Sequence, residues 1–235
     1  MRKLTLSILL SGVIAGSFSS VAAQEQRIDN IPMYGQPAIP RPEQLKKADE
    51  DFVKEAVAGL GTREAASKAW FAQGDEYMQK RNLDFAMRRY NQSWLLNPNN
   101  YQPYWGFGRV MLERGKFDEA IQHLEKAKDL VDDQYQKIAL LVDLGTAYSV
   151  RAEAAGKTSV TEGARLFALA NQTYSEALSL DPKYGNGWRR WAMSLYEQGD
   201  YAQAWEKVKQ ARAQNARPLP PAFLRALEQK MPEPR

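Results

Sequence analysis

Apolar and small residues recur along this chain at helical spacing, and the whole pattern repeats with a period of 34 residues. Apolar positions three or four residues apart predict amphipathic helices, and the period is long enough for two of them. The four sets are Trp70, Gly74, Tyr77, Ala86, Tyr90 and Pro98; Tyr104, Gly108, Met111, Ala120, Leu124 and Asp132; Leu141, Gly145, Tyr148, Ala170, Tyr174 and Pro182; Trp188, Ala192, Leu195, Ala204, Val208 and Ala216. We therefore expect four helix pairs.

Small residues occupy the positions at which the two helices of each pair should touch. Only a small side chain lets two backbones approach closely at such a point. Gly74, Gly108, Gly145 and Ala192 fill this position on the first helices, and Ala86, Ala120, Ala170 and Ala204 on the second. Gly115 and Gly199 indicate the turns inside the second and fourth pairs, and Pro98 and Pro182 end two of the second helices.

The period, the small residues and the turns together resemble the tetratricopeptide repeat family, whose unit is a helix–turn–helix of 34 residues. The segment from Glu113 to Ala120 is close to the family consensus for the turn. The resemblance implies an all-α fold, a right-handed superhelical solenoid of about four repeats with capping helices at both ends. The implied array covers residues 67–217, with repeats at 67–100, 101–134, 138–184 and 185–217.

The third repeat departs from the pattern in two places. Residues 135–137 are extra and precede it, and a surplus of thirteen residues lies near 151–163, where the sequence from Gly156 to Ser159 breaks the helical spacing. Insertions of this kind map to loops or lengthened helices on one face of a solenoid. We interpret the surplus as a tolerated insertion at the surface, because a longer loop costs little free energy. A dedicated contact site is the alternative.

Residues 1–23 have the layout of a secretory signal peptide. Arg2 and Lys3 precede an apolar stretch, and Val21-Ala22-Ala23 offers small residues for cleavage. An uncleaved N-terminal anchor is the alternative. The chain contains no cysteine, so it has no disulfides, no zinc–thiolate site and no cysteine for a lipid anchor. In a bacterium with two membranes these features predict a periplasmic protein.

Two further segments flank the predicted array. Residues 24–41 contain prolines at a density that excludes a helix and favours an extended arm. Residues 42–61 follow with an apolar stripe at helical spacing, ended by Gly59 and Gly61, and predict an N-terminal capping helix with Thr62 capping the next helix. Residues 218–235 predict a short C-terminal capping helix and a tail.

The charge balance gives no indication of nucleic-acid binding. Without Arg2 and Lys3 the chain keeps 30 basic residues against 28 acidic ones, and these are interspersed as on solvated helix faces. No second apolar segment reaches the length of a membrane span. We therefore expect no nucleic acid partner and no stable membrane span after cleavage.

No set of residues predicts catalysis, a metal site or a cofactor. His123 is the chain's one histidine and is expected on a solvated side of its helix, without the partners that a metal site or a catalytic base needs. Gly106-Phe107-Gly108 resembles the start of a dinucleotide fingerprint, but it lies within a predicted helix with no strand before it. We expect a protein that is not an enzyme.

The family resemblance places a peptide groove on the first helices of the repeats. Carried onto this chain, it implies a partner-binding surface that contains Phe71, Asp75, Met78, Trp105, Arg109, Leu112, Arg189 and Tyr196. The Lys and Asn that clamp a C-terminal carboxylate in some family members are absent, because those positions hold Phe71 with Asp75 and Trp105 with Arg109. We also expect the arm at 24–41 to occupy this groove at least part of the time.

These features favour an interaction scaffold or adaptor that binds a peptide segment of a cell-envelope protein. A carbohydrate- or peptidoglycan-binding module is the alternative, because exposed aromatic side chains could stack on sugar rings; the candidates are the tyrosines and Trp70, Trp94, Trp105, Trp188 and Trp191. Most of these tryptophans occupy repeat or packing positions, and Trp105 is the exception. The oligomeric state stays open.

Overall fold

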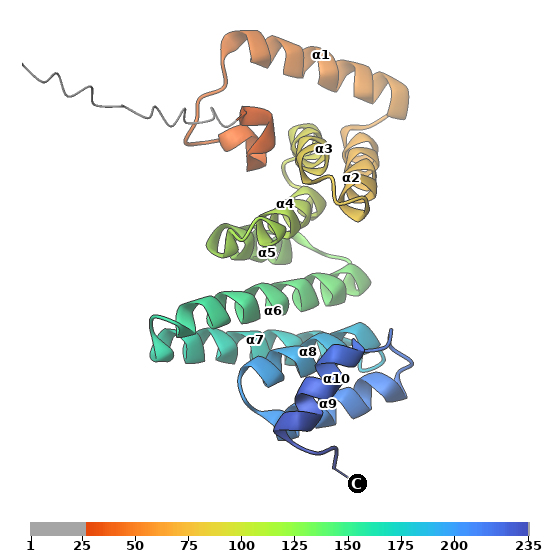
Figure 1. The fold of residues 1–235 in the computed structure, drawn as a ribbon. Helices are drawn as coiled ribbons and strands as arrows, with labels where there is room; N and C mark the ends of the chain where they lie inside the picture. Colours follow the sequence, from red (N-terminus) through yellow and green to blue (C-terminus); the bar gives the residue numbers. More distant parts are fainter. Residues whose placement is uncertain (1–26, 235) are drawn as a thin grey trace, which may run out of the picture.

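The computed structural model describes residues 27–234, and these residues form ten α-helices and no strand (Figure 1). The predicted signal peptide at 1–23 lies outside the described residues. The helices are α1 Glu43–Leu60, α2 Arg63–Gln79, α3 Leu83–Leu96, α4 Tyr101–Glu113, α5 Phe117–Leu130, α6 Gln134–Gly156, α7 Val160–Leu180, α8 Gly185–Glu197, α9 Tyr201–Ala213 and α10 Pro221–Lys230. The prediction of an all-α repeat array is confirmed.

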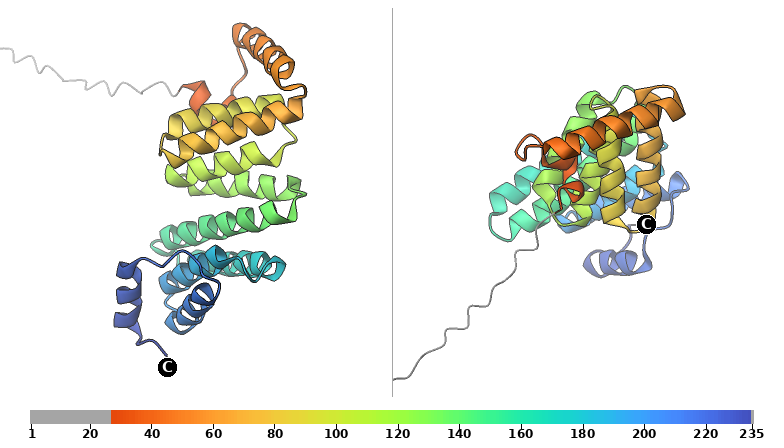
Figure 2. Two further views of the ribbon diagram at one scale, coloured as in Figure 1. Left: turned by 90° about the vertical axis from the view of Figure 1, so that its right-hand side faces the viewer. Right: turned by 90° about the horizontal axis from the view of Figure 1, so that it is seen from above.

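Helices α2 to α9 form four consecutive antiparallel pairs that stack along one direction (Figure 2). The turns follow the predicted chemistry. Gly115 and Gly199 have φ of 71° and 79°, a left-handed conformation that favours glycine, and each lies between the helices of a pair. Thr62 accepts a hydrogen bond from the backbone N–H of Ala65 at 3.0 Å and so caps α2, as predicted.

The third pair contains the longest helices of the array. The surplus near 151–163 extends α6 and α7 to 23 and 21 residues, and a short turn at 157–159 joins them. The extra residues 135–137 form the first turn of α6, which Asp133 caps by accepting hydrogen bonds from two backbone N–H groups. The insertion is thus continuous helix apart from this turn.

Glycines mark the closest approaches between helices. A Cβ atom at Gly106 would lie 2.6 Å from the ring of Tyr90, and one at Gly108 would lie 2.5 Å from Leu124. A Cβ atom at Gly74 would lie 2.4 Å from the same ring, so this fully buried ring packs against two glycine backbones. Gly106 lies outside the repeat pattern, and its close approach is to α3 of the preceding pair.

Residues 27–41 of the N-terminal arm are folded rather than extended, which corrects the prediction for this part of the arm. It contains two short 3-10 turns, Ile28–Asn30 and Pro32–Gly35. Met33 and Tyr34 both have left-handed backbone, with φ of 52° and 55°. This conformation is unfavourable by about 1–2 kcal/mol for each such residue, so contacts with the rest of the molecule must stabilise it.

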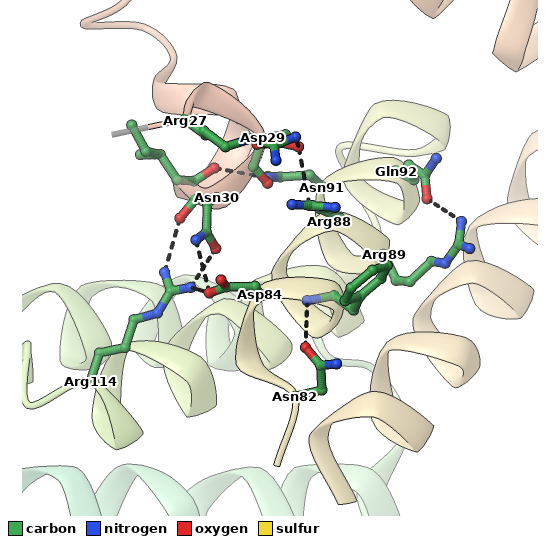
Figure 3. A network of polar contacts seen from close by, with 12 residues as sticks. Arg27, Asp29, Asn30, Asn82, Asp84, Arg88, Arg89, Asn91, Gln92 and Arg114 are labelled. Atoms are coloured by element: carbon green, nitrogen blue, oxygen red, sulfur yellow. Dashed lines mark hydrogen bonds and ion pairs between the residues drawn. The ribbon is translucent and has the colours of Figure 1, made fainter. Parts of the chain in front are cut away.

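Asn91 of α3 supplies three of those contacts. Its side chain is fully buried, donates hydrogen bonds to the carbonyls of Asp29 and Ile31 at 3.0 and 2.8 Å, and accepts one from the N–H of Tyr34 at 3.2 Å. Figure 3 shows the surrounding polar network, in which Arg114 also donates to the Asn30 carbonyl at 2.9 Å. One amide thus satisfies three backbone groups of the arm.

The arm lies on α3, the second helix of the first pair, and not among the first helices. The hypothesis that it occupies the groove of the first helices is therefore wrong. Beyond the two turns, Arg41 lies 3.9 Å above the ring of Tyr34 and pairs with Asp49 of α1 through two hydrogen bonds of 2.7 Å. The arm consequently connects α1 to α3.

Both ends of the array carry an additional helix. α1 packs through its second half, where Phe52 meets Trp70 with ring centroids 5.3 Å apart and Ala56 is buried. At the other end, Leu227 of α10 is fully buried, and Trp205 of α9 donates to the Met231 carbonyl at 2.9 Å. Each helix covers apolar surface that an end repeat would otherwise expose.

Candidate functional site

The first helices of the four pairs, α2, α4, α6 and α8, lie next to one another and form a continuous surface, here called the first-helix face. α2 contacts α4, α4 contacts α6, and α6 contacts α8, whereas the second helices of successive pairs have few or no such contacts. The first helices therefore approach each other more closely than the second helices do, which makes the first-helix face the inner side of the array.

Asp75 of α2 and Arg109 of α4 form an ion pair on this face. Their charged atoms are 2.8 Å apart, and the Tyr90 hydroxyl donates to the same carboxylate at 2.7 Å. Burial lowers the pKa of Arg109, but Asp75, the Tyr90 hydroxyl and Asp143 together outweigh this effect, so the pKa is above its ordinary value. Two of the predicted partner-binding residues thus bind each other and join the first two repeats.

Trp105 joins the second and third repeats in a similar way. Its indole N–H donates to the carboxylate of Asp143 in α6 at 2.8 Å, and its ring stacks on Phe71 with centroids 6.5 Å apart. The pKa of Asp143 is raised, and burial of its carboxyl group is the largest cause. The expectation that Trp105 lacks a packing role is wrong. Asp143 was not predicted, since it lies in an apolar stretch whose spacing gives no sign of a polar contact.

The other predicted partner-binding residues differ in their exposure. Phe71 is 7% exposed and packs against Tyr90, so it belongs to the core rather than to a free surface. Tyr196 contacts Phe223 of α10, with ring centroids 5.6 Å apart. Met78 and Leu112 are half-buried against the core. Arg189 is also half-buried, and its Nε has no hydrogen-bond partner among the described residues.

A cavity of about 190 Å³ lies between the first helices of the third and fourth repeats. Met193 and Val150 form part of its apolar lining, and the carboxylates of Glu153 and Glu197 lie at it and are exposed. Burial raises the pKa of Glu197, and the nearby Glu153 raises it further. Arg190 also lines the cavity, and Glu153 lies 3.8 Å from Lys157, so the apolar lining is bordered by charges of both signs.

The tryptophans are engaged in packing. None of the six, all of which lie in the described part of the chain, is an exposed side chain. Trp188 and Trp191 stack on each other with centroids 5.9 Å apart, and Lys207 lies 4.2 Å from the Trp191 ring. The Trp94 indole donates to the Tyr104 hydroxyl at 3.1 Å. The exposed aromatic side chains of the described residues are Phe85 and Tyr135, so the tryptophans give no support to the carbohydrate-binding alternative.

His123 is half-buried rather than solvated, which corrects the prediction. Its ring centroid lies 5.4 Å from that of Phe107. Burial lowers the pKa of His123 to about 4, and the nearby Glu119 opposes this only in part. The imidazole is therefore neutral at physiological pH.

We predict that His123 titrates near pH 4, which NMR can measure directly because the chain has a single histidine. The unfolded chain binds this proton near pH 6.5 and the folded chain only near 4, so stability falls as the pH decreases between these values. His123→Gln should lose this part of the pH dependence. A titration midpoint near 6.5 would contradict the buried position.

Residues 27–234 contain neither a cluster of metal-ligating side chains nor a membrane-spanning helix. No group of three or more His, Asp or Glu residues comes together as a metal site there. None of the helices formed by these residues is both long and apolar enough to cross a membrane.

No protein-family model matches the chain, and no curated protein matches it. Among solved structures, the crystal structure of MamA is similar at 16% sequence identity with a TM-score of 0.49, and the match covers 75% of this chain and 96% of that one. At this level the similarity carries no conclusion about a ligand, and the helical-repeat fold stands on the helices themselves.

Proposed function

We propose that this chain is an exported, non-enzymatic scaffold of the tetratricopeptide repeat type that binds a peptide segment of a cell-envelope protein on its first-helix face. Export depends on residues 1–23 acting as a cleaved signal peptide, which N-terminal sequencing of the protein recovered from the periplasm tests. The repeats offer an extended inner surface for such a segment.

One observation carries this proposal: the first-helix face is rigid in one half and open in the other. The Asp75–Arg109 pair and the Trp105–Asp143 hydrogen bond connect the first three repeats. Beyond them, Glu153 and Glu197 stand exposed beside the cavity between α6 and α8. A fixed surface that keeps charged groups and a cavity accessible is suited to binding a peptide without large rearrangement.

Affinity capture from envelope extract tests the proposal with two variants of equal charge change. Glu153→Lys combined with Glu197→Lys alters the first-helix face. The control combines Glu176→Lys and Glu206→Lys, two exposed residues on the second helices α7 and α9. We expect the wild type and the control to retain a common partner and the first-helix variant to lose it.

Circular dichroism must show equal helicity for both variants before the capture is compared. Loss of the partner in the control variant, or its retention in the first-helix variant, would exclude this part of the face as the binding surface.

A further inference from the structure

A second cavity lies away from the first-helix face, at the N-terminal end, between the arm, α1 and the first repeat. Its volume is about 800 Å³. It exists because α1 packs only through its second half, while residues 43–48 of its first half are exposed and stand away from α3 (Figure 1). We call this cavity the arm cleft.

Apolar side chains from three separate segments line the arm cleft. Ile39 and two prolines come from the arm, Val53 comes from α1, and Leu95 comes from the end of α3. Ile39 is 40% exposed, and Leu45 in the first turn of α1 is also exposed. Apolar surface gathered in this way on an otherwise charged protein indicates an interaction site.

The charged groups of the arm cleft leave a positive surplus. Arg41 and Asp49 neutralise each other through their two hydrogen bonds. Arg63 donates to the carbonyls of Leu96 and Leu95 at 2.7 and 2.9 Å, which fixes its position without neutralising its charge. Lys54 has no ion pair within residues 27–234.

Lys46 also lines the arm cleft and pairs with Glu43 at the surface, and Glu50 is the one remaining acid. An apolar ligand that carries carboxylates therefore complements the arm cleft. The chain's own residues 1–23 do not have this chemistry, because they contain Arg2 and Lys3 and no acidic residue.

We infer that the arm cleft binds an extended apolar segment of a partner protein that carries acidic residues. Extended segments dock against apolar grooves with alternate side chains in the groove, which leaves the intervening carboxylates for the lysines and Arg63 at the rim. This site is separate from the first-helix face, so the protein has two binding surfaces for two different segments.

Fluorescence anisotropy with three labelled nonapeptides tests the inference on the purified protein. One peptide alternates leucine with glutamate, and in the other two lysine or glutamine replaces every glutamate. We expect the glutamate peptide to bind most tightly and the lysine peptide least. Lys54→Glu exchanges an attraction for a repulsion and should weaken glutamate-peptide binding roughly five- to tenfold.

Lys47→Glu is the matched control, because Lys47 is exposed on the same helix but does not line the arm cleft. It should change the affinity less than twofold, whereas Ile39→Gln should weaken all three peptides. Equal binding of the lysine peptide, equal effects of the two lysine variants, or no binding of any peptide would overturn the inference. A concentration-dependent dimer that Lys54→Glu abolishes would instead assign the arm cleft to a second copy.

Discussion

Gly106→Ala should lower the free energy of unfolding by about 2 kcal/mol, an effect that a single methyl group rarely has on a helix surface. The new Cβ would lie 2.6 Å from the Tyr90 ring, closer than nonbonded carbon atoms approach. The ring has little room to move away, because it is fully buried and also packs closely against Gly74. Overpacking of this kind outweighs the gain of up to about 1 kcal/mol from the higher helix propensity of alanine. Urea unfolding followed by circular dichroism measures the difference.

Gly59→Ala provides the control for helix propensity. No atom lies within 4 Å of a Cβ at Gly59, near the end of α1, so alanine should leave stability unchanged or raise it by up to about 1 kcal/mol. If Gly106→Ala proves as stable as Gly59→Ala, Tyr90 does not fill the space between α2, α3 and α4 as described.

Asn91→Ala should release the arm from α3. The change removes the partners of two carbonyls and one N–H, and each lost hydrogen bond contributes about 1 kcal/mol. Without these hydrogen bonds, little remains to offset the free-energy cost of the left-handed backbone at Met33 and Tyr34. Tyr34, which is 7% exposed when docked, should become accessible, and chymotrypsin cleavage after it should accelerate roughly thirtyfold for a loss of about 2 kcal/mol.

Two variants separate this effect from general destabilisation of α3. Asn91→Asp keeps an acceptor for the Tyr34 N–H but cannot donate to the two carbonyls, so it should also release the arm. Gln92→Ala changes the neighbouring residue, whose amide accepts from Arg89 and not from the arm, and should leave the cleavage rate near the wild-type value. Equal acceleration in Gln92→Ala would mean that the Asn91 amide does not hold the arm.

The sequence predicts the features that depend on contacts within one repeat, which are the helices, the turns and the helix caps. The spacing of Gly74, Ala86 and Tyr90 reflects contacts between two helices joined by a short turn, and the structure confirms those helices. The turns and caps were predictable for the same reason, since glycine conformation and side-chain capping are local.

The contacts that organise the candidate surfaces are long-range, and the sequence does not reveal them. Asn91 lies among Arg88, Arg89 and Gln92, which looks like a solvated face, but its partners are about 60 residues earlier in the chain. Asp143 is likewise 38 residues from the indole that binds it. A helical period identifies which residues face inward, but it does not show which of these residues form hydrogen bonds with one another.

Site-specific photocrosslinking in living cells tests most directly whether the first-helix face binds a protein segment. A photoreactive amino acid placed at Glu153 or Glu197 samples that face, and the same residue at Glu176 or Glu206 samples the second helices. The proposed function predicts one shared crosslinked partner from both first-helix positions and none of it from the other two. The same partner from all four positions, or from the second helices alone, would contradict it.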